Sequence, residues 1–104
     1  MAQAVGMLEV FGLVTAFVAA EAGCKAADVT VEHFDKNKPG NADALPVPLI
    51  ICIKFRGEIA AVEAAMQAAE AAAEGISGVV DKYVIANPEE GTQKMLKLNA
   101  FDKN

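Results

Sequence analysis

The chain has 104 residues, enough for one domain with one hydrophobic core and too few for a second. Its net charge is -5, and nine lysines and arginines are spread along its length. Nucleic-acid binding, which needs a concentrated basic face, is therefore excluded. Apolar residues make up 54% of the chain and charged residues 22%, which argues against disorder. The mean hydropathy of +0.30 predicts that some apolar surface is buried between copies of the chain.

Neither the apolar runs nor the N-terminus indicates a membrane protein. The longest apolar run, residues 45–53, contains two prolines, whereas a spanning helix needs roughly 20 apolar residues. The N-terminus lacks the basic region and apolar core of a signal peptide, so we expect a cytoplasmic protein. Cys24 and Cys52 form neither a CxxC nor a paired metal motif, and we expect both to be reduced, buried thiols.

The first half of the chain predicts a strand, a helix and a second strand. Residues 4–11 are almost all apolar and end at Gly12, which indicates a buried strand and a turn. Helical spacing places five residues on the predicted core face of the next segment: Leu13, Ala16, Phe17, Ala20 and Cys24. Val14 and Val18 lie toward its polar side, and we expect them to contact a neighbouring subunit. Residues 28–35 alternate apolar and polar side chains, as a half-buried strand does.

The second half predicts a loop followed by strand, helix, strand and helix. Residues 36–48 carry three prolines, which suit an ordered loop and cannot sustain a strand ladder. Residues 49–55 are nearly continuously apolar, which indicates a strand covered on both faces. Residues 57–76 predict an alanine-rich helix, and residues 79–86 predict the last strand. One side of this helix carries a stripe of acids, and the opposite side is the predicted core face: Ile59, Val62, Met66, Ala69 and Ala73. A short helix opens at residues 88–90, and the tail after residue 98 is expected to be flexible.

This order is β-α-β-β-α-β plus a terminal helix, the ferredoxin-like α+β arrangement of an antiparallel sheet with helices on one face. The whole chain, residues 1–104, is expected to be a single domain. The other sheet face must be covered by the last helix or by another subunit.

Catalytic chemistry is nearly absent from the sequence. The chain has one serine, Ser77, and one histidine, His33, and their contexts do not predict a nucleophile with its base. No short ligand spacing indicates a metal site, and no glycine-rich run is suited to phosphate. The glutamate stripe is typical of a solvated helix face. An enzyme would have to form at subunit boundaries, with Lys25, His33 or Arg56 meeting carboxylates of a neighbouring copy.

Four segments resemble, in order and spacing, the hexagonal shell proteins of bacterial microcompartments, the BMC-domain family. The opening strand and turn read AVGMLE at residues 4–9 and GLV at 12–14. The other three segments are CKAADV at 24–29, RGEIAAV at 56–62 and YVIANP at 83–88. The resemblance covers nearly the whole chain and implies a structural protein that is not an enzyme and needs no cofactor.

The resemblance also implies an assembly and its partners. Cyclic homo-hexamers would tile edge to edge, together with other shell proteins, into a cytoplasmic microcompartment shell around encapsulated enzymes, and each would carry a central pore for small metabolites. In the family, the turn between the second and third strands lines this pore. That turn maps here onto Lys36, Asn37, Lys38, Pro39, Gly40, Asn41, Ala42 and Asp43.

The chain departs from the family pattern in this loop, which is longer than the usual short turn and contains Pro39, Pro46 and Pro48. Any residue facing a cyclic axis is repeated in every subunit. Lys36, Lys38 or Asp43 would therefore form a ring of charge that filters ions by sign.

The resemblance assigns two residues to the hexamer edge. Lys25 matches the lysine that the family uses there, and Asn87 stands where the family usually has an arginine. Without the guanidinium donors, sheet assembly by this protein alone is in question. The chain could be a minor component among other shell subunits, or a ring of another order.

Two further hypotheses stay open. Some divergent members of the family hold an iron-sulfur cluster at the pore through a loop cysteine, and the nearest thiol here is Cys52. The other alternative is a ferredoxin-like small-molecule sensor or regulatory domain, whose ligand would lie at a subunit interface beneath the long loop.

Overall fold

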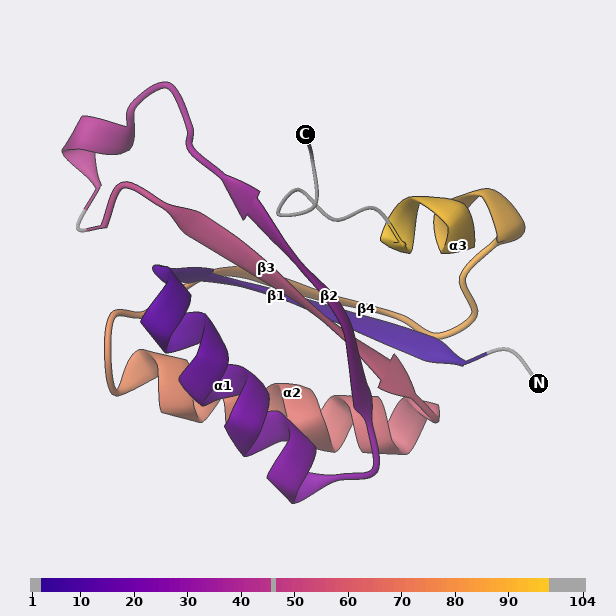
Figure 1. Cartoon of the computed structure of the whole chain (residues 1–104). Helices are drawn as coiled ribbons and strands as arrows, with labels where there is room; N and C mark the ends of the chain where they lie inside the picture. The colour runs from indigo at the N-terminus through magenta and orange to yellow at the C-terminus, as the bar shows by residue number, and fades with distance from the viewer. Residues whose placement is uncertain (1–2, 46, 98–104) are drawn as a thin grey trace.

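Strands and helices alternate in the predicted order within residues 3–45 and 47–97, which are the part of the chain that the computed structural model describes (Figure 1). The elements are β1 (Ala4–Phe11), α1 (Leu13–Ala26), β2 (Thr30–Asn37), the short 3-10 helix η1 (Ala42–Ala44), β3 (Ile50–Gly57), α2 (Ile59–Glu74), β4 (Val79–Ile85) and α3 (Glu90–Leu96). The predicted flexible tail after residue 98 lies outside the described residues.

The four strands form one antiparallel sheet in the order β2-β3-β1-β4. Helices α1 and α2 lie side by side on one face, and α3 lies on the other (Figure 1). This arrangement confirms the predicted ferredoxin-like α+β fold. The sheet order leaves β2 and β4 as the two edge strands, with α1 on the β2 side and α2 on the β4 side.

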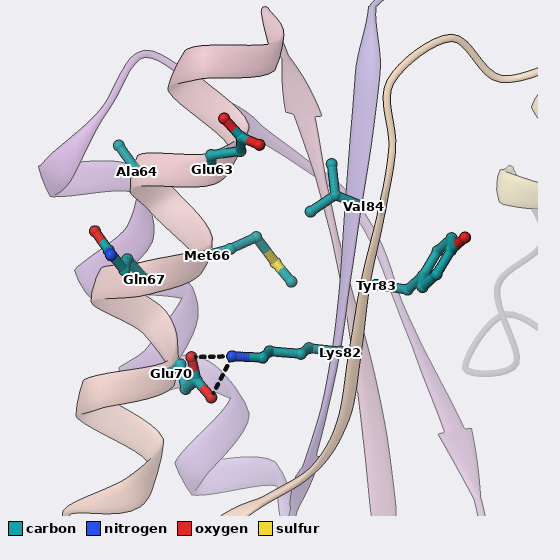
Figure 2. A pocket seen from close by; sticks show the side chains of 8 residues that line it. All are labelled: Glu63, Ala64, Met66, Gln67, Glu70, Lys82, Tyr83 and Val84. Atoms are coloured by element: carbon teal, nitrogen blue, oxygen red, sulfur yellow. Dashed lines mark hydrogen bonds and ion pairs between the residues drawn. The ribbon is translucent and has the colours of Figure 1, made fainter.

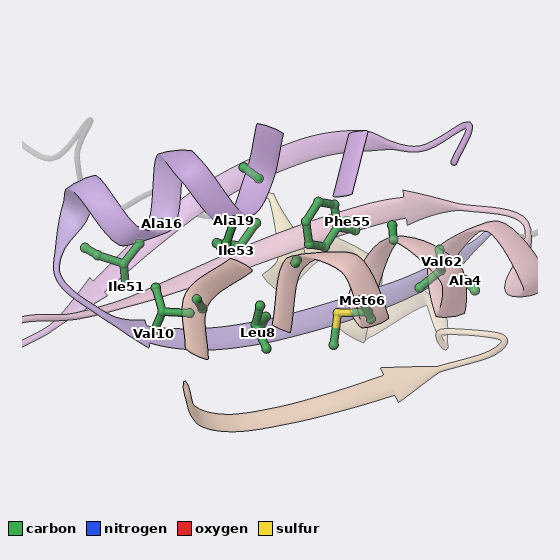
Figure 3. Close-up of a cluster of buried hydrophobic side chains, with 14 residues drawn as sticks. Ala4, Leu8, Val10, Ala16, Ala19, Ile51, Ile53, Phe55, Val62 and Met66 are labelled. Carbon is green, nitrogen blue, oxygen red and sulfur yellow. The ribbon is translucent and has the colours of Figure 1, made fainter. Parts of the chain in front are cut away.

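The core lies between the sheet and the two long helices (Figure 3). The two central strands contribute its largest side chains, because alternate residues of a strand point to the same face: Leu8, Val10, Ile51, Ile53 and Phe55. From α2 come Val62, Ala65, Met66, Ala69 and Ala73. This agrees with the predicted face of α2 except at Ile59, which is exposed at the start of the helix.

Helix α1 turns a different face to the core from the one that the spacing predicts. Leu13, Phe17 and Cys24 are exposed, whereas the buried residues are Thr15, Ala16, Ala19, Ala20 and Gly23. Because α1 lies close to both α2 and the sheet, small side chains fill the contact and the larger apolar ones are left outside. The expectation that Cys24 is buried is therefore wrong. Cys52 is partly buried, and both thiols are free.

Strand β2 begins two residues later than predicted, at Thr30. Its pairing with β3 is interrupted between Val31 and Phe34, where an irregularity shifts the register. The alternation of apolar and polar residues that begins at residue 28 therefore predicted a strand that starts two residues too early. Among the described helices, none is long and apolar enough to cross a lipid bilayer.

Candidate functional site

The connection between β2 and β3 folds back on itself. Two backbone bonds brace its first part: Ala42 N donates to Pro39 O over 3.0 Å, and Ala44 N donates to Asn41 O over 2.9 Å. Ala42 is buried although it lies within a surface loop. These contacts make residues 38–45 an ordered turn around η1, in which Lys38, Gly40, Asn41 and Asp43 are exposed. Lys36 and Asn37, which the sequence assigns to the loop, are instead the last two residues of β2, because both pair with β3.

The base of this loop is tied to the turn between β1 and α1. Gly12 N donates a hydrogen bond of 2.8 Å to Leu49 O. Gly12 has a φ of +90°, which favours glycine, and a Cβ atom there would lie 3.3 Å from Val47. The turn that ends β1 therefore also positions the chain as it enters β3.

Ser77, the only serine of the chain, has a structural position in the same region. Its hydroxyl donates to Phe11 O over 2.7 Å and lies 2.7 Å from the hydroxyl of the buried Thr15. These bonds join β1, α1 and the turn after α2 beneath the loop. The sequence offers no pattern from which this role could be found, since Thr15 and Ser77 are 62 positions apart.

The predicted edge residues lie at the other end of the sheet. The strand pairing identifies the two ends of the sheet. At the loop end, Ile50 pairs with both Asn37 and Phe11, and at the far end Val5 pairs with Ile85. Lys25 is in the last turn of α1, its side chain is 76% exposed, and its Nζ lies 3.2 Å from a carboxylate oxygen of Glu21. Asn87 follows β4 and is exposed, next to the buried Pro88. The loop and the two edge residues are thus separated by the length of the strands.

The sheet face opposite α1 and α2 carries a transverse row of polar groups. The register aligns Asp35, Cys52, Glu9 and Asp81 across all four strands. Burial and, to a smaller extent, the Asp81 carboxylate raise the pKa of Glu9. Burial and then the Glu9 carboxylate raise the pKa of the Cys52 thiol to about 11.

These residues do not fit an iron-sulfur cluster. A cluster at the pore needs thiolates that reach the axis, whereas Cys52 lies within β3 and not in the loop, and burial raises its pKa to about 11, which disfavours the thiolate. Within residues 3–45 and 47–97, no group of three or more His, Cys, Asp and Glu side chains is arranged to hold a metal ion.

Helix α3 covers part of this face through two cations of β3. Lys54 Nζ donates to Leu96 O over 3.3 Å and lies 3.8 Å from a carboxylate oxygen of Asp35. Arg56 donates to the side-chain oxygen of Gln93, and its Nε lies 3.4 Å from a carboxylate oxygen of Glu32. An enzyme formed at subunit boundaries would need Arg56 to meet a carboxylate of a neighbouring copy. Arg56 instead contacts Gln93 and Glu32 of its own chain.

A groove of about 670 Å³ runs between α2 and the edge strand β4, and is called here the α2–β4 groove (Figure 2). Met66 and Val84 point toward each other across it, and Tyr83 points away from α2. At one end, Lys82 Nζ binds both carboxylate oxygens of Glu70, over 2.7 and 2.8 Å. The groove follows the sheet edge, whereas the sensor hypothesis places its ligand beneath the long loop.

Comparison with known proteins identifies relatives of the chain. Residues 4–88 match the BMC domain family. The bacterial microcompartment shell protein PduA of Citrobacter freundii is 33% identical over 90% of this chain and 91% of its own length. The carboxysome shell protein CcmK3 of Halothece sp. is 30% identical over 99% of this chain and 94% of its own.

A further relative and a solved structure of the same fold are both longer than this chain. The shell protein EutK of Salmonella typhimurium is 35% identical over 92% of this chain, and the match spans 53% of EutK. A solved microcompartment protein from Desulfitobacterium hafniense shares the fold with a TM-score of 0.69 and 23% identity. That match covers 93% of this chain and 48% of the solved one.

Proposed function

The chain belongs to the BMC domain family and is a bacterial microcompartment shell protein, and from this premise we propose that it acts as a structural, non-catalytic subunit. Identical copies close into a ring, with six copies as the expected number. The ring carries a central pore for small metabolites and tiles into the shell in the cytoplasm, where it contacts other shell proteins and the enclosed enzymes.

The observation that carries this proposal is the separation of loop and edge. A ring subunit that tiles needs one end at the symmetry axis and the other at the perimeter. Here the loop after β2 lies at one end of the sheet, and Lys25 and Asn87 lie at the other. In the proposed ring, the strands would therefore run along the radius, with the loop toward the symmetry axis and the two edge residues toward the perimeter.

The loop gives the pore its expected chemistry. Lys36, Lys38 and Asp43 are exposed, and each would appear once per subunit around the axis. Like charges repeated at close quarters produce a field that attracts ions of one sign and repels the other. We propose that the pore selects small ions by charge.

The two predicted edge residues affect how the ring contacts neighbouring shell subunits. Lys25 is exposed at the end of α1 and is available to a neighbouring ring together with its Glu21 partner. Asn87 has no guanidinium, so it cannot donate the several hydrogen bonds that an arginine would offer across the edge. Contacts with other shell subunits that carry the arginine therefore compensate for the weaker edge of this chain.

Native mass spectrometry of the purified chain, followed by negative-stain microscopy, tests this proposal. We expect a complex of six times the chain mass of 10.8 kDa, with rings visible in the micrographs. A five-chain ring would retain the shell function and place the protein at a special position. A monomer, dimer or trimer at micromolar concentration would overturn the ring and its pore. Thermal stabilisation of such a species by small molecules would then favour the sensor.

A further inference from the structure

Helix α3 rests on the sheet through few apolar contacts. Within Glu90–Leu96, Leu96 is the one buried residue, whereas Lys94 is exposed and Met95 is 67% exposed. A helix of seven residues does not persist in water without tertiary contacts, because it has too few internal hydrogen bonds to offset its conformational entropy. The folded state of α3 therefore depends on its docking to the sheet.

This docking buries two cations of β3. Lys54 and Arg56, called here the Lys54–Arg56 row, lie on one face of the strand because they are two positions apart. Lys54 is 6% exposed and its Nζ donates to Leu96 O, while Arg56 donates to the side-chain oxygen of Gln93. Both acceptors on α3 are neutral oxygens, which only partly replace the hydration that a cation loses on burial. Hydration of the row therefore opposes the docking of α3.

The same region holds two polar atoms that lack hydrogen bonds. Arg56 Nη1 and Glu32 Oε1 are buried and have no hydrogen-bond partner in the part of the chain that the structure describes. Glu32 Oε1 lies 3.4 Å from Arg56 Nε, so the two side chains form an ion pair but satisfy only part of their hydrogen-bonding capacity. Buried polar atoms of this kind destabilise the closed arrangement, because water would otherwise bind them.

The sheet does not need α3 to keep these charges paired or its core covered. Lys54 Nζ lies 3.8 Å from a carboxylate oxygen of Asp35, and Arg56 is paired with Glu32, so both ion pairs lie between β2 and β3. The hydrophobic core lies on the other face of the sheet, against α1 and α2 (Figure 3). Movement of α3 would therefore leave the core and both ion pairs in place.

The connection between β4 and α3 is suited to act as a hinge. Figure 1 shows one short segment, residues 86–89, joining the two elements, and Ala86 and Asn87 form an exposed bend within it. The first turn of α3 is closed by local bonds: the Glu89 side chain accepts from Gly91 N, and Glu89 O accepts from Gln93 N, each over 2.9 Å. These bonds do not involve the sheet, so a change of dihedral angles in a few connecting residues can move α3.

We propose that α3 is a hinged cover, which opens about residues 86–89 while the sheet stays folded and so controls access of water and solutes to the Lys54–Arg56 row. The closed form is stabilised by the burial of Leu96 and by the two hydrogen bonds from the row. The open form is stabilised by hydration of the row and of Glu32. Because these contributions oppose each other, the cover opens far more often than the whole subunit unfolds. The movement takes place within one subunit and is independent of ring formation.

Acylation of Lys54 measures the opening directly. Acetic acid N-hydroxysuccinimide ester, used at single-hit levels and read by peptide mass spectrometry, reacts with an accessible amine. Leu96→Ala removes the apolar contact of the cover and should speed the acylation of Lys54 at least about tenfold. The matched control is Met95→Ala, which removes an exposed neighbour on α3 and should change the rate by less than about twofold. Lys25, whose side chain is 76% exposed, is the internal reference for reagent activity.

A core variant separates opening of the cover from unfolding of the subunit. Ile53 is fully buried on the core side of β3, away from α3. Ile53→Val should make global unfolding about two- to tenfold more frequent, a factor that urea unfolding measures. We expect the acylation rate of Lys54 to stay at the value of the unmodified chain. A rate that rises by the same factor as global unfolding would overturn the hinged cover.

Hydrogen exchange of peptic fragments gives a readout that does not depend on the lysine. We expect the backbone amides of α3 to exchange at least about a hundredfold faster than those of β3, and Leu96→Ala to accelerate α3 alone. Equal protection of α3 and β3, or a Leu96→Ala variant in which neither α3 exchange nor Lys54 acylation becomes faster, would show that α3 is a fixed part of the subunit. Such a result would leave the proposed shell function unchanged.

Discussion

Replacing Gly23 by alanine should destabilise the subunit, although alanine is the better helix former. A Cβ atom at this position would lie 2.7 and 2.8 Å from two ring carbons of Phe55 and 3.1 Å from the backbone oxygen of Ala65. Phe55 is fully buried, and the oxygen belongs to α2, so neither neighbour can move away freely. Overpacking of this kind costs about 1–3 kcal/mol, against a gain in helix propensity of about 1 kcal/mol. Because both obstacles are rigid, we expect a cost of about 2–3 kcal/mol, in the upper part of that range, and hence a net loss of about 1–2 kcal/mol.

Urea unfolding followed by far-UV circular dichroism measures this change. Both proteins must be compared at one protein concentration, because assembly adds to the apparent stability. The matched control is Gly75→Ala at the end of α2, where φ is -75° and the nearest neighbour of a Cβ is an oxygen at 3.5 Å. It should gain about 0.4–1 kcal/mol. A Gly23→Ala variant as stable as the unmodified chain would refute the argument that α1 is held at the distance of a glycine contact.

Three further variants test other parts of the structure. Glu9→Gln should raise stability at neutral pH, because burial and Asp81 disfavour the charged carboxylate. The gain should vanish as the pH falls and the native glutamate becomes protonated, and a constant gain in pH-dependent urea unfolding would contradict this cause. Ser77→Ala should lose about 1–3 kcal/mol, since Thr15 keeps a buried hydroxyl without its partner; an unchanged melting temperature would show that the bond is dispensable. Asn87→Arg should promote extended sheets in negative-stain images. If the unmodified chain forms sheets equally well, the argument that Asn87 weakens the edge contact is wrong.

Much of the candidate site could be predicted from the sequence, because its parts are local. The prolines after β2 exclude a strand, which identifies the loop, and Lys25 and Asn87 fall within short segments that resemble the family. What holds the loop could not be predicted. The bonds from Gly12 to Leu49 and from Ser77 to Phe11 join positions far apart in the chain. The burial of Lys54 under α3 could not be predicted either, because nothing in the sequence of an apolar strand indicates which group its lysine will bind.

By itself, the sequence determined the order of strands and helices and most of their bounds, because hydrophobic period and turn residues act over neighbouring positions. It predicted β1 and the core face of α2 well, since their apolar residues repeat regularly. Only the tertiary structure decided which face of α1 is buried, because close approach to Phe55 and α2 selects Gly23 and alanines over Phe17. Only the antiparallel register placed the loop and Asn87 at opposite ends of the sheet. These features depend on contacts between distant segments, and such contacts have no period along the chain.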